Sequence, residues 1–156
     1  MTAQPDARTP VYLDDVVVGS MFESEEVTIT AEDIIAFAKQ FDPQPFHLDA
    51  AAAEHSFFGG LAASGWHTAS ITMRLLVTGG PALAGGTIGA GGEITWPSPT
   101  RPGDRLHVRA TVLSVTASKS RPDRGSAILK VETLTSDGEL RQLFTVRTLV
   151  FQRPDE

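Results

Sequence analysis

The sequence contains no cysteine, a single tyrosine and few basic residues, with 13 lysines and arginines among 156 residues. Without cysteine, the chain forms no disulfides, no thiolate metal sites or iron–sulfur ligation, and has no cysteine nucleophile. Acidic residues outnumber basic ones, so the formal net charge is −6 at pH 7. Contacts with phosphates need clustered lysine and arginine. This balance therefore disfavours a nucleic-acid binder and a protein of anionic membrane surfaces.

Long apolar runs are also missing. The most apolar stretch, residues 57–80, is interrupted by His67, Arg74 and several glycines, serines and threonines. A helix that crosses a membrane needs roughly 18 or more consecutive apolar residues. Hydrophobic residues still make up 41% of the chain, enough for one core. We expect a soluble, cytoplasmic protein with a flexible arm over residues 1–10 and one domain over residues 11–156.

Hydrophobic spacing predicts an α+β domain. Thr30 and Asp33 form a variant of the capping box, and apolar residues then follow at helical spacing up to Phe41. A longer helix is predicted over residues 61–78, where small residues fill the first half and two glycines follow the end. Strands are predicted over residues 21–29, 88–96, 106–115, 126–134 and 140–151. Short turns between the last four favour an antiparallel sheet with the long helix on one face.

The irregular segment between the two predicted helices carries the groups best suited to chemistry. Asp42 and His47 lie five positions apart, with Pro43 and Pro45 between them. We expect the prolines to hold the segment extended and to break the alternation of a straight strand, which permits the two side chains to converge. A carboxylate and an imidazole that share one water can remove and return a proton.

Taken singly, these residues also have simpler interpretations. An aspartate before a proline is common in turns, and a lone histidine is more often a hydrogen-bonded structural residue. His67 lies beside the apolar stripe of the long helix, which favours a structural or pocket-lining role. The scattered histidines match no metal-binding motif, and the glycines of residues 85–92 lack the spacing of a dinucleotide-binding loop.

Three motifs together resemble one known family. The first is Asp42-Pro43-Gln44-Pro45-Phe46-His47, followed by a small residue, Ala53, six positions after the histidine. The others are residues 58–66, at the entry to the central helix, and residues 96–104, with a proline-glycine-aspartate turn. This pattern resembles the MaoC-like dehydratases, which include the (R)-specific enoyl-CoA hydratases, over residues 11–151. Gln44 stands where many members have asparagine, and Ser64 stands where many have histidine.

The resemblance implies a hot-dog fold, in which a bent antiparallel sheet wraps around a long central helix. It implies an enoyl-CoA hydratase or dehydratase in which Asp42 and His47 hold the catalytic water. The backbone N–H of Gly65 would stabilise the thioester oxygen at the helix start. Four residues are expected to bind substrate: Ser64, Phe46, Phe58 and Trp66. The family also implies no cofactor beyond the coenzyme A of the substrate, and a homodimer or dimer of dimers with sites at the subunit interface.

Two other functions stay open at this point. A hot-dog thioesterase would use the same oxyanion site, but members of that type usually carry the carboxylate in another motif or on the long helix. Residues 61–78 contain no aspartate or glutamate, which counts against it. The other alternative is a non-catalytic subunit that binds acyl thioesters, and its support lies in the departures at Gln44 and Ser64.

Overall fold

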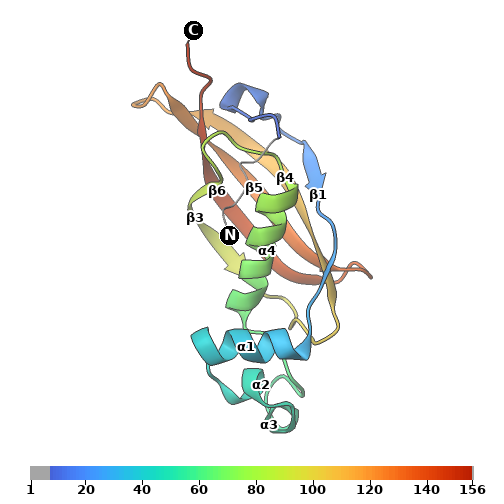
Figure 1. Cartoon of the computed structure of the whole chain (residues 1–156). Coiled ribbons are helices and arrows are strands. Elements are labelled where there is room, and N and C mark those ends of the chain that lie inside the picture. Colours follow the sequence, from blue (N-terminus) through green and yellow to red (C-terminus); the bar gives the residue numbers. More distant parts are fainter. Residues whose placement is uncertain (1–7, 156) are drawn as a thin grey trace.

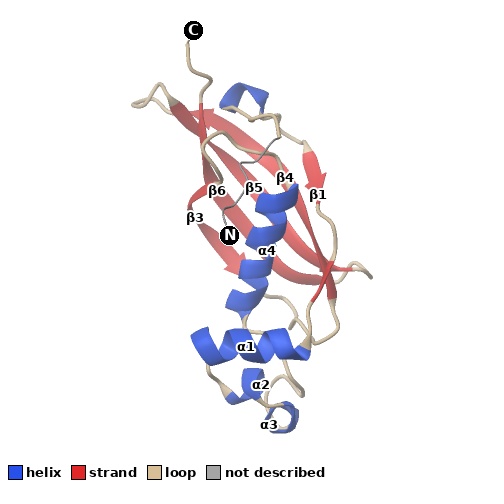
Figure 2. Ribbon diagram, viewed as in Figure 1, coloured by secondary structure: helices blue, strands red, loops and turns tan. Residues whose placement is uncertain are grey.

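A computed structural model describes residues 8–155 of the chain. It consists of one bent antiparallel sheet with the helix α4 (Gly65–Gly79) lying across its concave face. Three shorter helices gather beyond the start of α4 (Figures 1 and 2): α1 (Ala31–Phe41), α2 (Pro45–Leu48) and α3 (Ala50–Glu54). This is the α+β arrangement predicted from the sequence. The predicted flexible arm falls mostly outside the described residues.

The sheet has the strand order β1-β4-β5-β6-β3, with β2 also paired to β4. Its strands are β1 (Met21–Glu23), β2 (Val27–Thr28), β3 (Ile88–Thr95), β4 (Arg105–Ala117), β5 (Arg124–Thr135) and β6 (Leu140–Phe151). The single strand predicted over residues 21–29 is therefore two short strands. They are separated because Ser24 bonds to Val108 through both its backbone N–H, at 2.9 Å, and its side-chain oxygen, at 2.8 Å.

The helix α1 (Ala31–Phe41) begins as its sequence predicts. Thr30 Oγ1 accepts from the Asp33 N–H at 3.1 Å, and the Asp33 carboxylate accepts from the Thr30 N–H at 3.3 Å. This reciprocal pair satisfies N–H groups that have no partner within the helix. The helix ends at Asp42, whose backbone N–H donates to Ala38 O. The capping thus fixes where the chain releases the Asp42 side chain.

The proline-containing part of the segment, expected to be extended, instead forms the short helix α2 (Pro45–Leu48), which is followed by the short helix α3 (Ala50–Glu54). Pro45 occupies the first turn of α2, where its fixed φ suits a helix and its missing N–H costs nothing. The prediction considered only the restriction that a proline places on the residue before it. The helical turn brings His47 back toward Asp42.

The central helix starts at Gly65, four residues later than predicted. The preceding residues bond elsewhere: Ala62 N–H donates to Phe46 O at 3.2 Å and Ala63 N–H to Thr100 O at 2.9 Å. Ser64 then caps the helix by accepting from the Trp66 N–H at 3.3 Å. The late start places Gly65 at the first helical position.

The face of α4 that packs on the sheet is partly polar. Its buried residues include Thr68, Thr72 and Leu76, and only the last joins the apolar cluster formed with Val108, Val131 and other residues of the sheet. Three large apolar residues of the same helix stay exposed in the single chain: Trp66, Met73 and Val77. Among residues 8–155, no helix combines the length and the hydropathy that a membrane span requires.

Candidate functional site

Asp42 and His47 converge at the end of α1. The Asp42 Oδ2 and His47 Nε2 atoms lie 3.2 Å apart, with the imidazole almost fully buried and the carboxylate 18% exposed. On its other side, His47 Nδ1 lies 2.6 Å from the carbonyl oxygen of Ala62. A carbonyl only accepts, so Nδ1 must carry a hydrogen, and Nε2 is the nitrogen that faces the Asp42 carboxylate. The Ala62 carbonyl therefore fixes the His47 tautomer in which Nδ1 carries the hydrogen.

The carboxylate of Asp42 is held in its ionised form. Gln44 Nε2 donates to Asp42 Oδ1 at 2.6 Å, and the Ser64 hydroxyl also bonds to this carboxylate. Burial by itself raises the pKa of Asp42. The bonds from Gln44 and Ser64, with the neighbouring His47, outweigh it and set the pKa below the ordinary value of 3.8. Gln44 therefore fills a definite role in this chain, although many family members have asparagine there.

Gly65 places a backbone donor beside this pair. As the first residue of α4, it has no carbonyl within the helix to receive its N–H, and the helix dipole adds partial positive charge there. A Cβ at Gly65 would lie 2.6 Å from Cε2 of Trp96. Only glycine permits this close approach between the start of α4 and the end of β3.

These groups open into a pocket of about 700 Å³. Its wall combines the polar groups of Asp42, His47 and Ser64 with a set of aromatic residues, Phe57, Phe58, Trp66 and Trp96. The buried residues Thr68 and Thr100 also line it, and Thr68 Oγ1 donates to Thr100 Oγ1 at 2.9 Å. The pocket therefore offers apolar surface for a hydrocarbon group beside groups that can move protons.

Three of the four residues expected to bind substrate line this pocket: Ser64, Phe58 and Trp66. Phe46 does not line it and packs behind the site. Its ring contacts His47 edge-on, with centroids 4.6 Å apart, and lies against the apolar cluster of Ile29 and Ile34. Phe46 thus supports the imidazole. Trp96, Thr68 and Thr100 also line the pocket but were not predicted from the sequence. Their positions in the sequence give no signal for that role.

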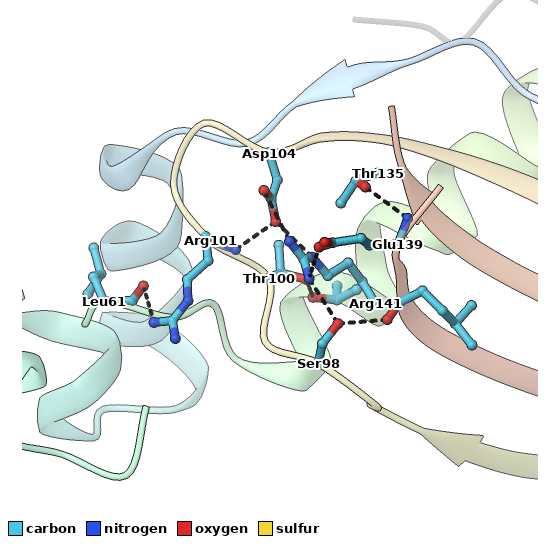
Figure 3. Close-up of polar contacts among 10 residues, drawn as sticks. Leu61, Ser98, Thr100, Arg101, Asp104, Thr135, Glu139 and Arg141 are labelled. Atoms are coloured by element: carbon cyan, nitrogen blue, oxygen red, sulfur yellow. Dashed lines mark hydrogen bonds and ion pairs between the residues drawn. The ribbon is translucent and has the colours of Figure 1, made fainter. Parts of the chain in front are cut away.

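The loop after β3, residues 96–104, forms one wall of the pocket. Hydrogen bonds and an ion pair hold it to the segment before α4 and to β6 (Figure 3). The Arg101 guanidinium donates to the carbonyls of Phe58, Gly60 and Leu61, in the segment before α4. Asp104 accepts from Arg101 N at 2.9 Å and pairs with Arg141 of β6 at 3.0 Å. The proline-glycine-aspartate motif pointed to the turn. Its partner Arg141, distant in sequence, carries no recognisable motif.

His67 lies outside this pocket. Its ring stacks on Phe37 with centroids 4.6 Å apart, and its Nδ1 has no hydrogen-bond partner among residues 8–155. Burial lowers the pKa of His67 below 6.5, although the charge of Asp33 acts in the opposite direction. The residue is therefore a packed structural histidine that lines a separate hollow beside α1. Within residues 8–155, no cluster of three or more His, Cys, Asp or Glu side chains could hold a metal ion.

A second cavity lies at the far end of α4. It has a volume of about 190 Å³ and lies between Leu76, the sheet residues Val112 and Leu129, and the entering chain at Val11. Its lining is mainly apolar, and neither residue of the dyad contributes to it. The two ends of α4 therefore border cavities of different chemical character.

Comparison with known proteins places this chain in a family. The family model described as "MaoC like domain" matches residues 15–133. The crystal structure of a MaoC-like dehydratase from Rhodospirillum rubrum is 59% identical, with a TM-score of 0.90, and covers 93% of this chain and 99% of that one.

Two further similarities agree. The R-hydratase PhaJ1 from Pseudomonas aeruginosa is 24% identical with a TM-score of 0.70, over 92% of this chain and 88% of that one. The uncharacterized protein YdeM of Bacillus subtilis is 35% identical over 104 residues, which are 65% of this chain and 72% of that protein. The chain therefore belongs to the MaoC-like domain family, and its fold is the hot-dog fold of the MaoC-like dehydratases and (R)-hydratases.

Proposed function

We propose that this protein is an enoyl-CoA hydratase or dehydratase that acts through Asp42, His47 and Gly65. One observation carries the proposal: the Asp42 carboxylate and the His47 imidazole lie 3.2 Å apart in a pocket that also contains the start of a helix. Membership of the family and the likeness to a MaoC-like dehydratase support hydratase or dehydratase chemistry in general. The roles of the individual residues and the class of substrate are part of the proposal.

The dyad would hold and activate a water molecule. His47 Nε2, the ring nitrogen that is not bonded to Ala62 O, takes a proton from the water as its oxygen attacks C3 of the enoyl group. The ionised Asp42 stabilises the imidazolium that results. That proton is then delivered to C2, so that one O–H bond and the C2=C3 π bond break while a C3–O bond and a C2–H bond form. Dehydration is the same sequence reversed.

Gly65 would stabilise the charge that grows on the thioester oxygen. Its N–H is a donor fixed at the helix start, and it acts at the point where the enolate forms. Loss of one such donor typically costs about 10²–10³-fold in rate. The absence of a side chain lets the thioester approach the backbone directly.

We also propose a homodimer. β3 pairs only with β6 among the described strands, and it is exposed along almost its whole length. An unpaired edge of this kind favours pairing with another strand. The exposed residues Trp66, Met73 and Val77 of α4 would also gain cover from a second copy. Light scattering on the purified protein should give twice the chain mass, and a monomer at micromolar concentration would contradict this.

The test of function follows the enoyl absorbance of crotonyl-CoA and of a panel of longer and branched enoyl-CoAs. We expect absorbance to fall as 3-hydroxyacyl-CoA forms, with no release of free thiol. Release of thiol would instead indicate a thioesterase. The absence of acidic residues from α4 argues against that function. Binding of these thioesters without turnover of any of them would indicate the non-catalytic subunit.

A further inference from the structure

Trp96 joins the end of β3 to the start of α4. Its six-membered ring lies where a Cβ on Gly65 would approach to 2.6–2.8 Å, so the ring rests directly on that backbone. It also meets the ring of Trp66 edge-on, with centroids 5.4 Å apart. Although Trp96 is 40% exposed, this direct contact means that a shift of the ring toward α4 would displace the Gly65 backbone.

The Trp96 ring is itself oriented by a buried polar chain. Its Nε1–H donates to Gln142 Oε1 at 2.9 Å, and Gln142, on β6, is fully buried. Gln142 Nε2 donates onward to Thr72 Oγ1 of α4 at 3.1 Å. Thr72 Oγ1 lies 2.5 Å from Thr133 Oγ1 of β5. The chain therefore ties the pocket wall to the central helix and to two strands.

The contacts assign a donor to each hydrogen bond of this series. Thr72 donates its hydroxyl hydrogen to Thr68 O at 2.8 Å, so it accepts from both Gln142 and Thr133. Each bond then has one donor and one acceptor, and the orientation of the Gln142 amide is set from both ends. Such a network rigidifies its members only when it is fully satisfied, because a buried amide without partners is costly.

An apolar layer would fill this space at lower cost. One turn along α4, Leu76 packs directly on Val131 and Val146 of the same two strands. Leucine and valine contacts have little directional preference, whereas the indole N–H bond to Gln142 holds the ring in one orientation. The polar residues thus hold the Trp96 ring in a defined orientation at the pocket wall.

We propose that Gln142 is a positioning residue for the reaction, acting through Trp96 to fix the Gly65 N–H relative to Asp42 and His47. The proposal rests on the proposed function. Gln142 lies behind Trp96 and is not among the residues that line the pocket. Its effect should therefore appear in the rate of the chemical step, since small displacements of a catalytic group reduce rate more than they reduce binding.

The test is Gln142→Leu, which keeps most of the side-chain volume and removes both hydrogen bonds. We expect kcat for crotonyl-CoA hydration to fall about 10- to 100-fold, with KM changed by less than about threefold. The matched control is Thr148→Val, which removes a fully buried hydroxyl from the same strand, beside the far cavity. Both variants lose some stability, so rates are compared per folded molecule well below each Tm. Only Gln142→Leu should lose kcat.

Trp96→Phe separates positioning from a general loss of packing. It retains a ring against Gly65 but has no N–H for Gln142. If the two residues act through one bond, the double variant should lose scarcely more kcat than the worse single variant. Independent, multiplicative losses would contradict the proposal.

The chain has two tryptophans. In a Trp66→Phe background, the Trp96 emission should therefore shift when Gln142→Leu is added, and an unchanged spectrum would also overturn the proposal.

The outcomes distinguish this inference from the proposed function. If wild type hydrates enoyl-CoAs and Gln142→Leu keeps full kcat per folded molecule, the positioning role is wrong and the function stands. If wild type turns over no enoyl-CoA, the proposed function fails, and the Trp96 emission in the Trp66→Phe background decides the inference. A shift when Gln142→Leu is added then supports positioning of the Trp96 ring by Gln142, and an unchanged spectrum refutes it.

Discussion

The two ends of α4 rest on the same sheet but are built differently. At its start, Gly65 lines the same pocket of about 700 Å³ as the Asp42–His47 pair. At its other end, Leu76 borders a mainly apolar cavity of about 190 Å³ and packs on the cluster that includes Val131. Figure 1 shows both ends on one helix, with α1 to α3 gathered only at the first. One end carries the proposed active site, and the other packs against the apolar core.

Three inward-facing residues, one turn apart, mark the change. Thr68 and Thr72 form hydrogen bonds with Thr100 and Gln142, whereas Leu76 joins the apolar cluster of the core. A net hydrogen bond contributes about 1 kcal/mol, and full burial of a leucine about 1.5–3 kcal/mol. The start of α4 therefore adds less stability per residue. Activity and stability should respond to substitutions at opposite ends of one helix.

The largest expected effect is at the site end. His47→Gln removes the proton-accepting nitrogen but keeps an amide N–H for Ala62 O. We expect kcat to fall about 10²–10⁴-fold, the usual contribution of a positioned acid–base group, with a small change in Tm. Steady-state hydration of crotonyl-CoA and a thermal melt on the same sample check this. Full activity in His47→Gln would remove the difference between the two ends.

The converse substitution is at the packing end. Leu76→Ala should reduce the free energy of unfolding by about 2–5 kcal/mol, because it leaves a cavity under α4 beside one that already exists. Urea unfolding followed by circular dichroism measures this loss. The kcat per folded molecule should stay within about twofold of wild type, since the dyad is several turns away. A large loss of kcat without unfolding would show that the far end also serves catalysis.

The smallest effect concerns pH. Burial against Phe37 sets the pKa of His67 below 6.5, so the unfolded chain binds a proton at higher pH than the folded one. This contribution to stability is complete above about pH 6.5 and is lost as the pH falls below it. His67→Phe keeps an aromatic stack and should flatten the dependence of unfolding free energy between about pH 7 and pH 5. An unchanged slope would mean that His67 does not titrate there.

Local patterns predicted much of the fold and the central pair of the site. The capping box at Thr30, the order of the elements and the antiparallel sheet follow from periodicity and turn residues. Asp42 and His47 were predicted by the family motif, and the structure places them side by side. Of the residues predicted to bind substrate, Trp66 and Phe58 line the pocket, whereas Phe46 packs against His47 from behind.

The remaining features depend on partners distant in sequence. The late start of α4 follows from bonds of Ala62 and Ala63 to Phe46 and Thr100, which no helix propensity contains. The helical turn at Pro45 was missed because proline was considered only as a breaker. Trp96 and Gln142 lie 46 positions apart, and only the pairing of the strands brings them together. Sequence periodicity assigns residues to a face, but it does not say which residues share a hydrogen bond.

The most direct measurement is the kcat of Asp42→Asn for crotonyl-CoA at neutral pH, with Tm recorded on the same preparation. This substitution keeps the shape of the side chain and removes the charge held by Gln44 and Ser64. We expect kcat to fall by at least about 10²-fold while Tm drops only slightly. Retention of most of the activity, or a loss that merely follows unfolding, would contradict the claim that the start of α4 is the catalytic end.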